Sequence, residues 1–153
     1  MTATGTATVA PVGARAMADL FTAYLESGRA APGLFAPDVF VDFTMPAWRL
    51  QARGIDDALA LRRGGHPGTG RVLRSRFDPT PAGFVLEVEE SWDDAADGDG
   101  TADGDAGGHW YCRELFRADL SPAGITELAV YCTGDWSAAR VAEHARTVAL
   151  IRP

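Results

Sequence analysis

The sequence predicts an α+β domain in which a curved antiparallel sheet wraps around helices to form a cone, with a further helix at the C-terminus. Three observations lead to this fold class. A helical apolar period comes early in the chain, a series of strand patterns joined by short turns follows, and a second helical period ends the chain. Consecutive strands joined by tight turns pair antiparallel, and helices outside the run of strands cover one face.

Two helices and a helical turn are predicted in the first part of the chain. The first helix has apolar residues at positions i, i+3, i+4, i+7 and i+8, and Gly28 ends it. A short turn of helix is expected over 33–36. Asp56 is the predicted N-cap of the second helix, and Gly64 and Gly65 end it. The apolar positions are Met17, Leu20, Phe21, Tyr24 and Leu25, then Ala58, Leu59 and Leu61.

Five segments have the composition or alternation of strands. The first is rich in β-branched and aromatic residues and stops at Pro46, and Trp48 is expected in the loop that follows. Turn sequences at 78–83 and 121–124 separate later strands. Ser137 is the predicted N-cap of the last helix. The strands are predicted over Val39–Met45, Val72–Phe77, Phe84–Trp92, Trp110–Ala118 and Ile125–Thr133.

Residues 13–153 are predicted to form one domain, because 153 residues suffice for a single core. Segment 1–12 is small and polar, and 93–108 contains only Asp, Gly and Ala apart from one Thr. Neither can bury enough apolar surface to order itself, so we expect a disordered N-terminal segment and a mobile acidic loop. An EF-hand is excluded in this loop because Ala102 and Gly108 stand where glycine and glutamate are required.

Composition and charge narrow the possible function. A net charge of −7 argues against nucleic acid or an anionic membrane as a partner. No secretory leader and no apolar stretch of about 18 residues is evident, so the expected compartment is the cytoplasm. Cys112 and Cys132 are too few and too far apart in the sequence for a zinc site or a disulfide framework. We expect no metal and no cofactor.

The element order over residues 14–150 resembles that of the nuclear transport factor 2-like superfamily, which includes SnoaL-like polyketide cyclases and ketosteroid isomerase. Segments 34–42, 84–92 and 123–127 carry the similarity. The resemblance implies a cone whose interior binds or transforms small molecules, and a homodimer formed through the outer face of the sheet.

The residues that act in these relatives are replaced here. Asp42 aligns one residue before the general base of ketosteroid isomerase, and Phe43 takes the place of that base. Val130 aligns with the acidic residue of SnoaL-like cyclases. Neither reaction can therefore be transferred directly, although Asp42 remains a catalytic candidate. Its alternation with apolar neighbours predicts that it points to the outer face, in a structural role.

Two glutamates fall on strand faces that are otherwise apolar. Glu90 alternates with Val88 and Trp92, and Glu114 follows Cys112 on its face. Desolvating a carboxylate is costly, so each acid must be paired, protonated or used in catalysis. These two residues are the leading catalytic candidates.

Hairpin register predicts that the two acids lie close together. Pairing Trp92 with Trp110 puts Glu90 opposite Cys112, and the next hairpin is expected to put Val130 opposite Glu114 and Cys132 opposite Cys112. The acids are then diagonal neighbours, about 7–8 Å apart at the backbone. One pKa should rise, and such a pair could move the proton of an isomerisation, a dehydration or an aldol-type cyclisation. Neutralisation by Arg71, Arg74 or Arg113 remains the open alternative.

A histidine and several aromatic residues complete the candidates. His66 is expected on an exposed loop, where a near-neutral pKa would suit a general acid or base; no further ligand is spaced to make a metal site with it. The candidate substrate-binding residues could form a pocket for a small apolar, aromatic or polyene-type substrate, although core packing explains many of them equally well. They are Phe43, Met45, Trp48, Trp92, Trp110, Cys112, Val130 and Trp136.

Two hypotheses on function follow. In the first, the chain is a cofactor-independent enzyme that isomerises, cyclises or dehydrates a small molecule, with Glu90 as base and Glu114 as acid. In the second, it is a non-catalytic module for ligand binding or dimerisation. The second predicts that arginine neutralises both glutamates and that no pocket is large enough for a ligand.

Overall fold

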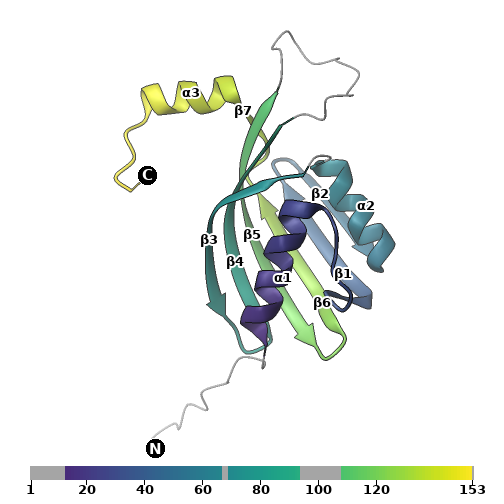
Figure 1. The fold of residues 1–153 in the computed structure, drawn as a ribbon. Coiled ribbons are helices and arrows are strands. Elements are labelled where there is room, and N and C mark those ends of the chain that lie inside the picture. Colours follow the sequence, from purple (N-terminus) through teal and green to yellow (C-terminus); the bar gives the residue numbers. More distant parts are fainter. Residues whose placement is uncertain (1–12, 67–68, 94–107, 153) are drawn as a thin grey trace, which may run out of the picture.

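The structure, a computed structural model, describes residues 13–66, 69–93 and 108–152. Figure 1 shows α1 lying across one face of a curved sheet, α2 beside β1 and β2, and α3 standing away from the sheet. Segment 1–12 and most of the acidic loop, 94–107, lie outside the described residues. The elements are α1 (Ala14–Ser27), β1 (Phe35–Met45), β2 (Trp48–Arg53), α2 (Ile55–Gly65), β3 (Arg71–Pro79), β4 (Gly83–Asp93), β5 (His109–Ser121), β6 (Gly124–Cys132), β7 (Trp136–Ser137) and α3 (Ala138–Thr147).

The α+β fold class is confirmed, but the sheet is mixed. Its strand order is β2-β1-β6-β5-β4-β3, with the short β7 paired to β5. The pairing of β1 with β6 is parallel, whereas every other described pairing is antiparallel. Tight turns impose antiparallel pairing only on consecutive strands. Because α2 and four strands separate β1 from β6 in the chain, turn chemistry could not predict their relative direction.

Three local predictions are wrong. No helical turn forms over 33–36, because β1 already begins at Phe35, which pairs with Ile125 of β6. Trp48 opens β2 rather than a loop, and this edge strand pairs with β1 while remaining largely exposed. The N-cap of α2 is Gly54, and Asp56 lies in the first turn. An acidic side chain there still interacts favourably with the helix dipole.

The main core lies between α1 and the sheet. The predicted stripe of α1 is confirmed in part: Phe21 and Leu25 are buried, whereas Leu20 is exposed. The ring of Phe21 meets that of Phe116 on β5 at 4.9 Å between centroids, in an edge-to-face arrangement. Such aromatic contacts favour close packing of the helix on the sheet. The described helices include none that is long and apolar enough to cross a bilayer.

The hairpin registers decide which side chains share the inner face. Trp92 pairs with Trp110 and Glu90 with Cys112, as predicted. In the next hairpin Glu114 faces Cys132, not Val130, because the turn pairs Ser121 with Gly124 and a bulge between Asp119 and Leu120 shifts the register by one more residue. The shift is an even number of residues, so the same side chains still point inward.

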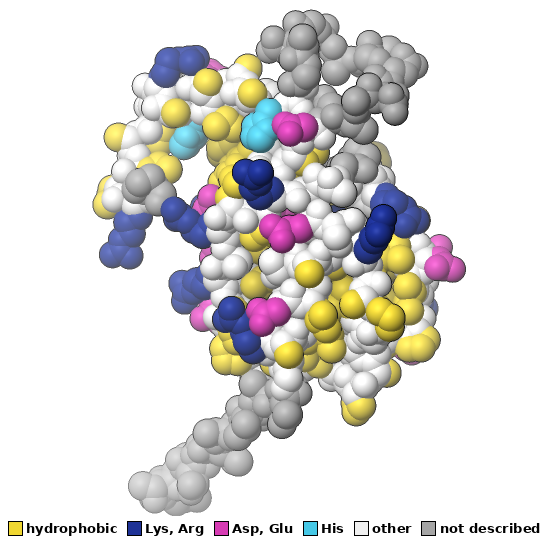
Figure 2. Space-filling view, viewed as in Figure 1, with side chains coloured by type: hydrophobic (Ala, Val, Ile, Leu, Met, Phe, Trp, Pro, Cys, Tyr) yellow, Lys and Arg dark blue, Asp and Glu magenta, His cyan; other side chains and the backbone are white. Residues whose placement is uncertain are grey.

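Helix α3 packs only lightly against the rest of the chain. Ser137 caps it as predicted, accepting a hydrogen bond from the backbone N–H of Arg140 at 3.3 Å. The helix buries none of its residues. The surface that carries α3 shows hydrophobic side chains in Figure 2, and Val141 and Val148 are among those exposed. The apolar side of α3 is thus open to a second surface.

We expect Gly124→Ala to destabilise the fold. Gly124 has φ +118°, and an added Cβ would lie 2.6 Å from the carbonyl oxygen of Gly33 and 2.9 Å from that of Leu34. Both are backbone atoms, so the start of β6 would have to move away from the segment before β1. The free energy of unfolding should fall by at least about 1–3 kcal/mol in denaturant titrations.

Gly64→Ala is the matched control, because Gly64 lies in α2 with open space around its Cβ position. This change should leave stability unaltered or raise it by up to about 1 kcal/mol. Equal stability of the Gly124 variant and the wild type would contradict the close approach of the two backbones.

Candidate functional site

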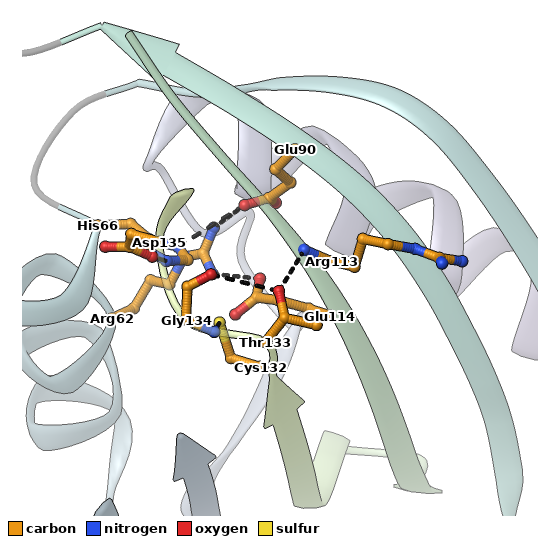
Figure 3. A network of polar contacts seen from close by, with 9 residues as sticks. All are labelled: Arg62, His66, Glu90, Arg113, Glu114, Cys132, Thr133, Gly134 and Asp135. Carbon is orange, nitrogen blue, oxygen red and sulfur yellow. Dashed lines mark hydrogen bonds and ion pairs between the residues drawn. The ribbon is translucent and has the colours of Figure 1, made fainter. Parts of the chain in front are cut away.

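A guanidinium group buried between two carboxyl groups forms the centre of the candidate site. Arg62 of α2 donates from Nη2 to Oε2 of Glu90 at 2.6 Å and from Nη1 to Oε2 of Glu114 at 2.8 Å. Glu90 lies on β4 and Glu114 on β5, and both are at most 2% exposed. Figure 3 shows the guanidinium reaching both carboxyl groups. The two predicted acids are therefore brought together, around an arginine.

The arginine that neutralises them differs from the three expected from sequence. Arg113, for example, points to the other face of β5 and pairs with Glu87 and Glu89. Arg62 follows the buried Ala58 by four residues, which places both on the inward side of α2. That spacing is the sequence signal that could have identified it. Burial disfavours its charge, but Glu114 and Glu90 outweigh burial and raise the pKa of Arg62.

Each of the two acids keeps one oxygen free of hydrogen bonds. Oε1 of Glu90 and Oε1 of Glu114 are buried and have no partner among the described residues. Burial raises the pKa of Glu114, against the lowering effect of Arg62. An acid of this kind keeps its proton to a higher pH than an exposed glutamate does. Glu114 can thus donate a proton while a neighbouring carboxylate accepts one.

His66 lies inside the site rather than on an exposed loop. Its side chain is 6% exposed, and its ring packs on Trp92 with 4.3 Å between centroids. Nε2 is 3.2 Å from Oδ1 of Asp135, and Nδ1 is 3.7 Å from Oε2 of Glu90. Burial lowers the pKa of His66, but hydrogen bonds with Asp135 and Cys132 outweigh this and raise it to about 9.

Sequence reasoning missed Asp135. This residue follows β6 and precedes β7, in a connection where the backbone turns at Gly134 with φ +79°. The turn brings the carboxylate to the imidazole of His66, from the far end of the chain (Figure 3). The sequence gives only a weak signal for Asp135, an aspartate directly before Trp136 in a connection that contains glycine. No periodic pattern there predicts where its side chain points.

The two cysteines lie beside this histidine. One ligand atom from each of His66, Cys112, Cys132 and Asp135 can be chosen so that all four lie within 4.8 Å of one another. The expectation that the cysteines are too far apart in the sequence for a zinc site is wrong, whereas the predicted hairpin register had already placed them on neighbouring strands. Neighbouring strands β5 and β6 bring them together across the hairpin, although they are distant in sequence. Sulfur, imidazole nitrogen and carboxylate oxygen are all metal ligands, so this set could hold an ion.

An apolar cavity of about 30 Å³ lies next to Arg62, between α1, α2 and the sheet. Among the described residues that line it, Arg62 and Tyr24 are the only ones with ionisable side chains. Burial raises the pKa of Tyr24, so its hydroxyl stays neutral. The lining residues are Phe21, Tyr24, Leu25, Phe35, Val41, Phe43, Ala58, Leu61, Arg62, Phe116, Leu128 and Val130.

Of the predicted substrate-binding residues, Phe43 and Val130 line this cavity, and Met45 packs against the core around it. None of the tryptophans in the described part of the chain does so. Trp92 covers His66, and Trp48 is 64% exposed at the β1–β2 connection.

The remaining candidates lie elsewhere. Trp110 is half-buried on β5, opposite Ser137 of β7, and Trp136 packs against Tyr111 and His144 near α3. Asp42 points to the outer face, as the alternation of β1 predicted, and forms an ion pair with Arg49. That hydrogen-bonded guanidinium lowers the pKa of Asp42. Asp42 therefore has no contact with the cavity.

Comparison with solved structures identifies the fold. A phenazine biosynthesis-related protein from Pseudomonas aeruginosa aligns with a TM-score of 0.55 and 14% identity, over 91% of this chain and 86% of its own. A candidate ketosteroid isomerase from Kribbella flavida aligns with a TM-score of 0.55 and 13% identity, over 92% of this chain and 90% of its own. A nuclear transport factor 2-like protein from Anabaena variabilis aligns with a TM-score of 0.54 and 17% identity, over 88% of this chain and 96% of its own.

These similarities show that the chain has the nuclear transport factor 2-like fold, in agreement with the expectation from sequence. At this level of identity the likeness concerns the fold alone. No protein-family model matches the sequence, and no curated protein matches it significantly.

We expect Arg62→Leu to be strongly destabilising. The change leaves Glu90 and Glu114 buried without a counter-charge, and breaking a buried ion pair on one side typically costs about 3–5 kcal/mol. Arg113→Leu is the matched control, because Arg113 also contacts two glutamates, but its side chain is 49% exposed.

The control should change the free energy of unfolding by less than about 1 kcal/mol. Both values can be measured by denaturant titration at neutral pH. If the two variants lost the same stability, Arg62 would not be the counter-charge that keeps the acids in the core.

Proposed function

We propose that this chain is a small-molecule enzyme that catalyses a proton transfer, of the isomerase, cyclase or dehydratase type. The observation that carries the proposal is the pair of carboxyl groups, Glu90 and Glu114, held by Arg62, which itself lines an apolar cavity. Solved structures of the same fold include a candidate isomerase and a protein related to phenazine biosynthesis, which supports an enzymatic role.

We infer complementary tasks for the two acids from their contacts with Arg62. Arg62 occupies Oε2 of each residue, so Oε1 of each is the oxygen that can exchange a proton. Glu90 would act as the base, because the raised pKa of Glu114 makes Glu114 the proton donor of the pair. Glu114 would act as the acid. Isomerisation, dehydration and aldol-type cyclisation all remove a proton from one atom and deliver one to another, as such a pair can do without a catalytic cofactor.

The size and lining of the cavity suit a small apolar or aromatic substrate. Pockets for drug-sized ligands measure about 300–1,000 Å³, whereas this one measures about 30 Å³. A substrate must therefore displace side chains as it enters. Several phenylalanines surround the cavity, so the substrate class is apolar, with a single polar group that faces Arg62.

A non-catalytic ligand-binding or dimerisation module is the second candidate. Two observations favour it: Arg62 contacts both acids, and the cavity is narrow. In addition, the outer sheet face exposes Leu115 and Tyr131, which fits a homodimer through that face. In this case the buried charges would serve only to orient α2 on the sheet.

Turnover of simple probes separates the two functions. β,γ-Unsaturated ketones and β-hydroxyketones both yield conjugated enones, which ultraviolet absorbance detects. We expect turnover by the wild type and a loss of about 10²–10⁴-fold in kcat/KM for Glu90→Gln and Glu114→Gln, the range ascribed to general acid–base catalysis.

Glu87→Gln is the control, because Glu87 lies on the outer face of β4 and pairs with Arg113. It should keep wild-type turnover. Thermal unfolding of all three variants would show whether each remains folded. Unchanged turnover in both buried-site variants, or no turnover of any probe by the folded wild type, would favour the non-catalytic module instead.

A further inference from the structure

A second cluster of chemically reactive side chains lies beside the contact of Arg62 with Glu90 and Glu114, which we call the Arg62 clamp, and takes no part in the proton transfer proposed above. It consists of His66, Cys112, Cys132 and Asp135, whose candidate ligand atoms lie within 4.8 Å of one another. His66 caps the C-terminal end of α2, Cys112 lies on β5, Cys132 is the last residue of β6, and the connection to β7 contributes the aspartate. Four separate segments thus converge on one point.

The donor set is that of a tetrahedral zinc-class site. Two thiolate sulfurs, one imidazole nitrogen and one carboxylate oxygen are all ligands of Zn²⁺, and four protein ligands are typical of closed structural sites. Thiolates select soft or borderline ions over Mg²⁺ and Ca²⁺, which prefer oxygen. A spread of 4.8 Å between ligand atoms is slightly wider than a bound ion would require, so small side-chain movements would complete the site.

The surroundings of the cluster favour ion binding. His66 directs Nε2 towards Asp135, at 3.2 Å, and Nδ1 towards Oε2 of Glu90, at 3.7 Å. Nδ1 is buried and has no hydrogen bond among the described residues. A histidine that binds metal through one nitrogen commonly faces a carboxylate with the other, which fixes its tautomer and orientation. Glu90 is placed to do this.

Two further contacts hold the ligands in place. The ring of His66 packs on Trp92 with 4.3 Å between centroids, which limits its rotation. The backbone N–H of Gly134 donates to Sγ of Cys132 at 3.3 Å, and such a donor stabilises a sulfur that carries negative charge.

A neighbouring set is unsuitable for an ion. His66, Glu90, Cys112 and Glu114 also lie within 4.8 Å of one another, but both of its glutamates already bind the guanidinium of Arg62, whose positive charge repels a cation. In the first set, by contrast, two thiolates and Asp135 would supply three negative charges at one point. A divalent cation offsets most of that charge.

We propose that His66, Cys112, Cys132 and Asp135 bind one zinc-class divalent cation in tetrahedral geometry. With four protein ligands the ion has no open position for substrate, so its role is structural. It fastens the end of α2 and the β6–β7 connection to β5, and thereby holds the polar end of the cone together. None of the four ligands takes part in the proton transfer proposed above, although Glu90 faces His66 and so adjoins both sites.

The test is a titration of the reduced full-length chain with Co²⁺ and then Zn²⁺. The protein is first treated with a chelator and a phosphine reductant, and a thiol assay must find both cysteines free. We expect one equivalent of Co²⁺ to give sulfur-to-cobalt charge-transfer absorption and the strong visible bands of tetrahedral coordination, and Zn²⁺ to remove both.

Three variants test the ligands. Cys132→Ser should weaken the charge-transfer absorption and the affinity, and Asp135→Asn should lower the affinity at least about 10–100-fold, by comparison with losses measured at outer-shell partners. Asp135 has a 37% exposed side chain, so its variant can be expected to fold. Asp93→Asn is the control, since it disrupts the other described His–Asp contact, between exposed His109 and Asp93, which lacks cysteines.

Several results would overturn the proposal. They are the absence of charge-transfer absorption at one equivalent, the weak bands of octahedral cobalt, equal affinity of the wild type and Asp135→Asn, or an equal loss in Asp93→Asn. A Cys112–Cys132 disulfide that persists after reduction would also do so. None of these readouts depends on turnover, so a failure here leaves the proposed function to be judged by its own experiment.

Discussion

The contact between the Arg62 guanidinium and two buried glutamates is the interaction on which the rest of the site depends. Burying an ion in a protein costs roughly several kcal/mol of hydration free energy, even after the protein relaxes around it. Such an ion therefore needs charges of opposite sign and good hydrogen bonds. Arg62 finds both in Glu90 and Glu114. The dependence is mutual, because a carboxylate could not stay charged on an apolar strand face without the arginine.

The clamp also positions α2 relative to the sheet. Most contacts of this helix are with β1 and β2 at one side of the sheet. Arg62 spans from there to β4 and β5, and His66 extends the link to the connection after β6. The helix is thus joined by polar contacts to strands that it does not cover. Because charged hydrogen bonds have narrow geometric limits, they fix the position of α2 more closely than apolar packing does.

The inside of the cone is therefore divided into two regions. One is the aromatic core under α1, where Phe21, Phe84 and Phe116 meet. The other is the polar end, where guanidinium, carboxyl, imidazole and thiol groups gather within a small volume. The cavity lies where these regions adjoin, with Arg62 in its wall. A ligand that enters would place its apolar part on the phenylalanines and a polar group towards the clamp.

The sequence by itself determined the fold class, the α1 stripe, the first hairpin register and the inward direction of both glutamates, because periodicity and turn chemistry are local properties. It did not determine the parallel β1–β6 pairing or the burial of His66. Nor did it show that Arg62, rather than an arginine on a neighbouring strand, binds the two glutamates, or that Cys112 and Cys132 lie close to Asp135. Each of these joins segments far apart in the chain. Their proximity depends on how the sheet curves and where α2 docks, and only the tertiary structure decides that.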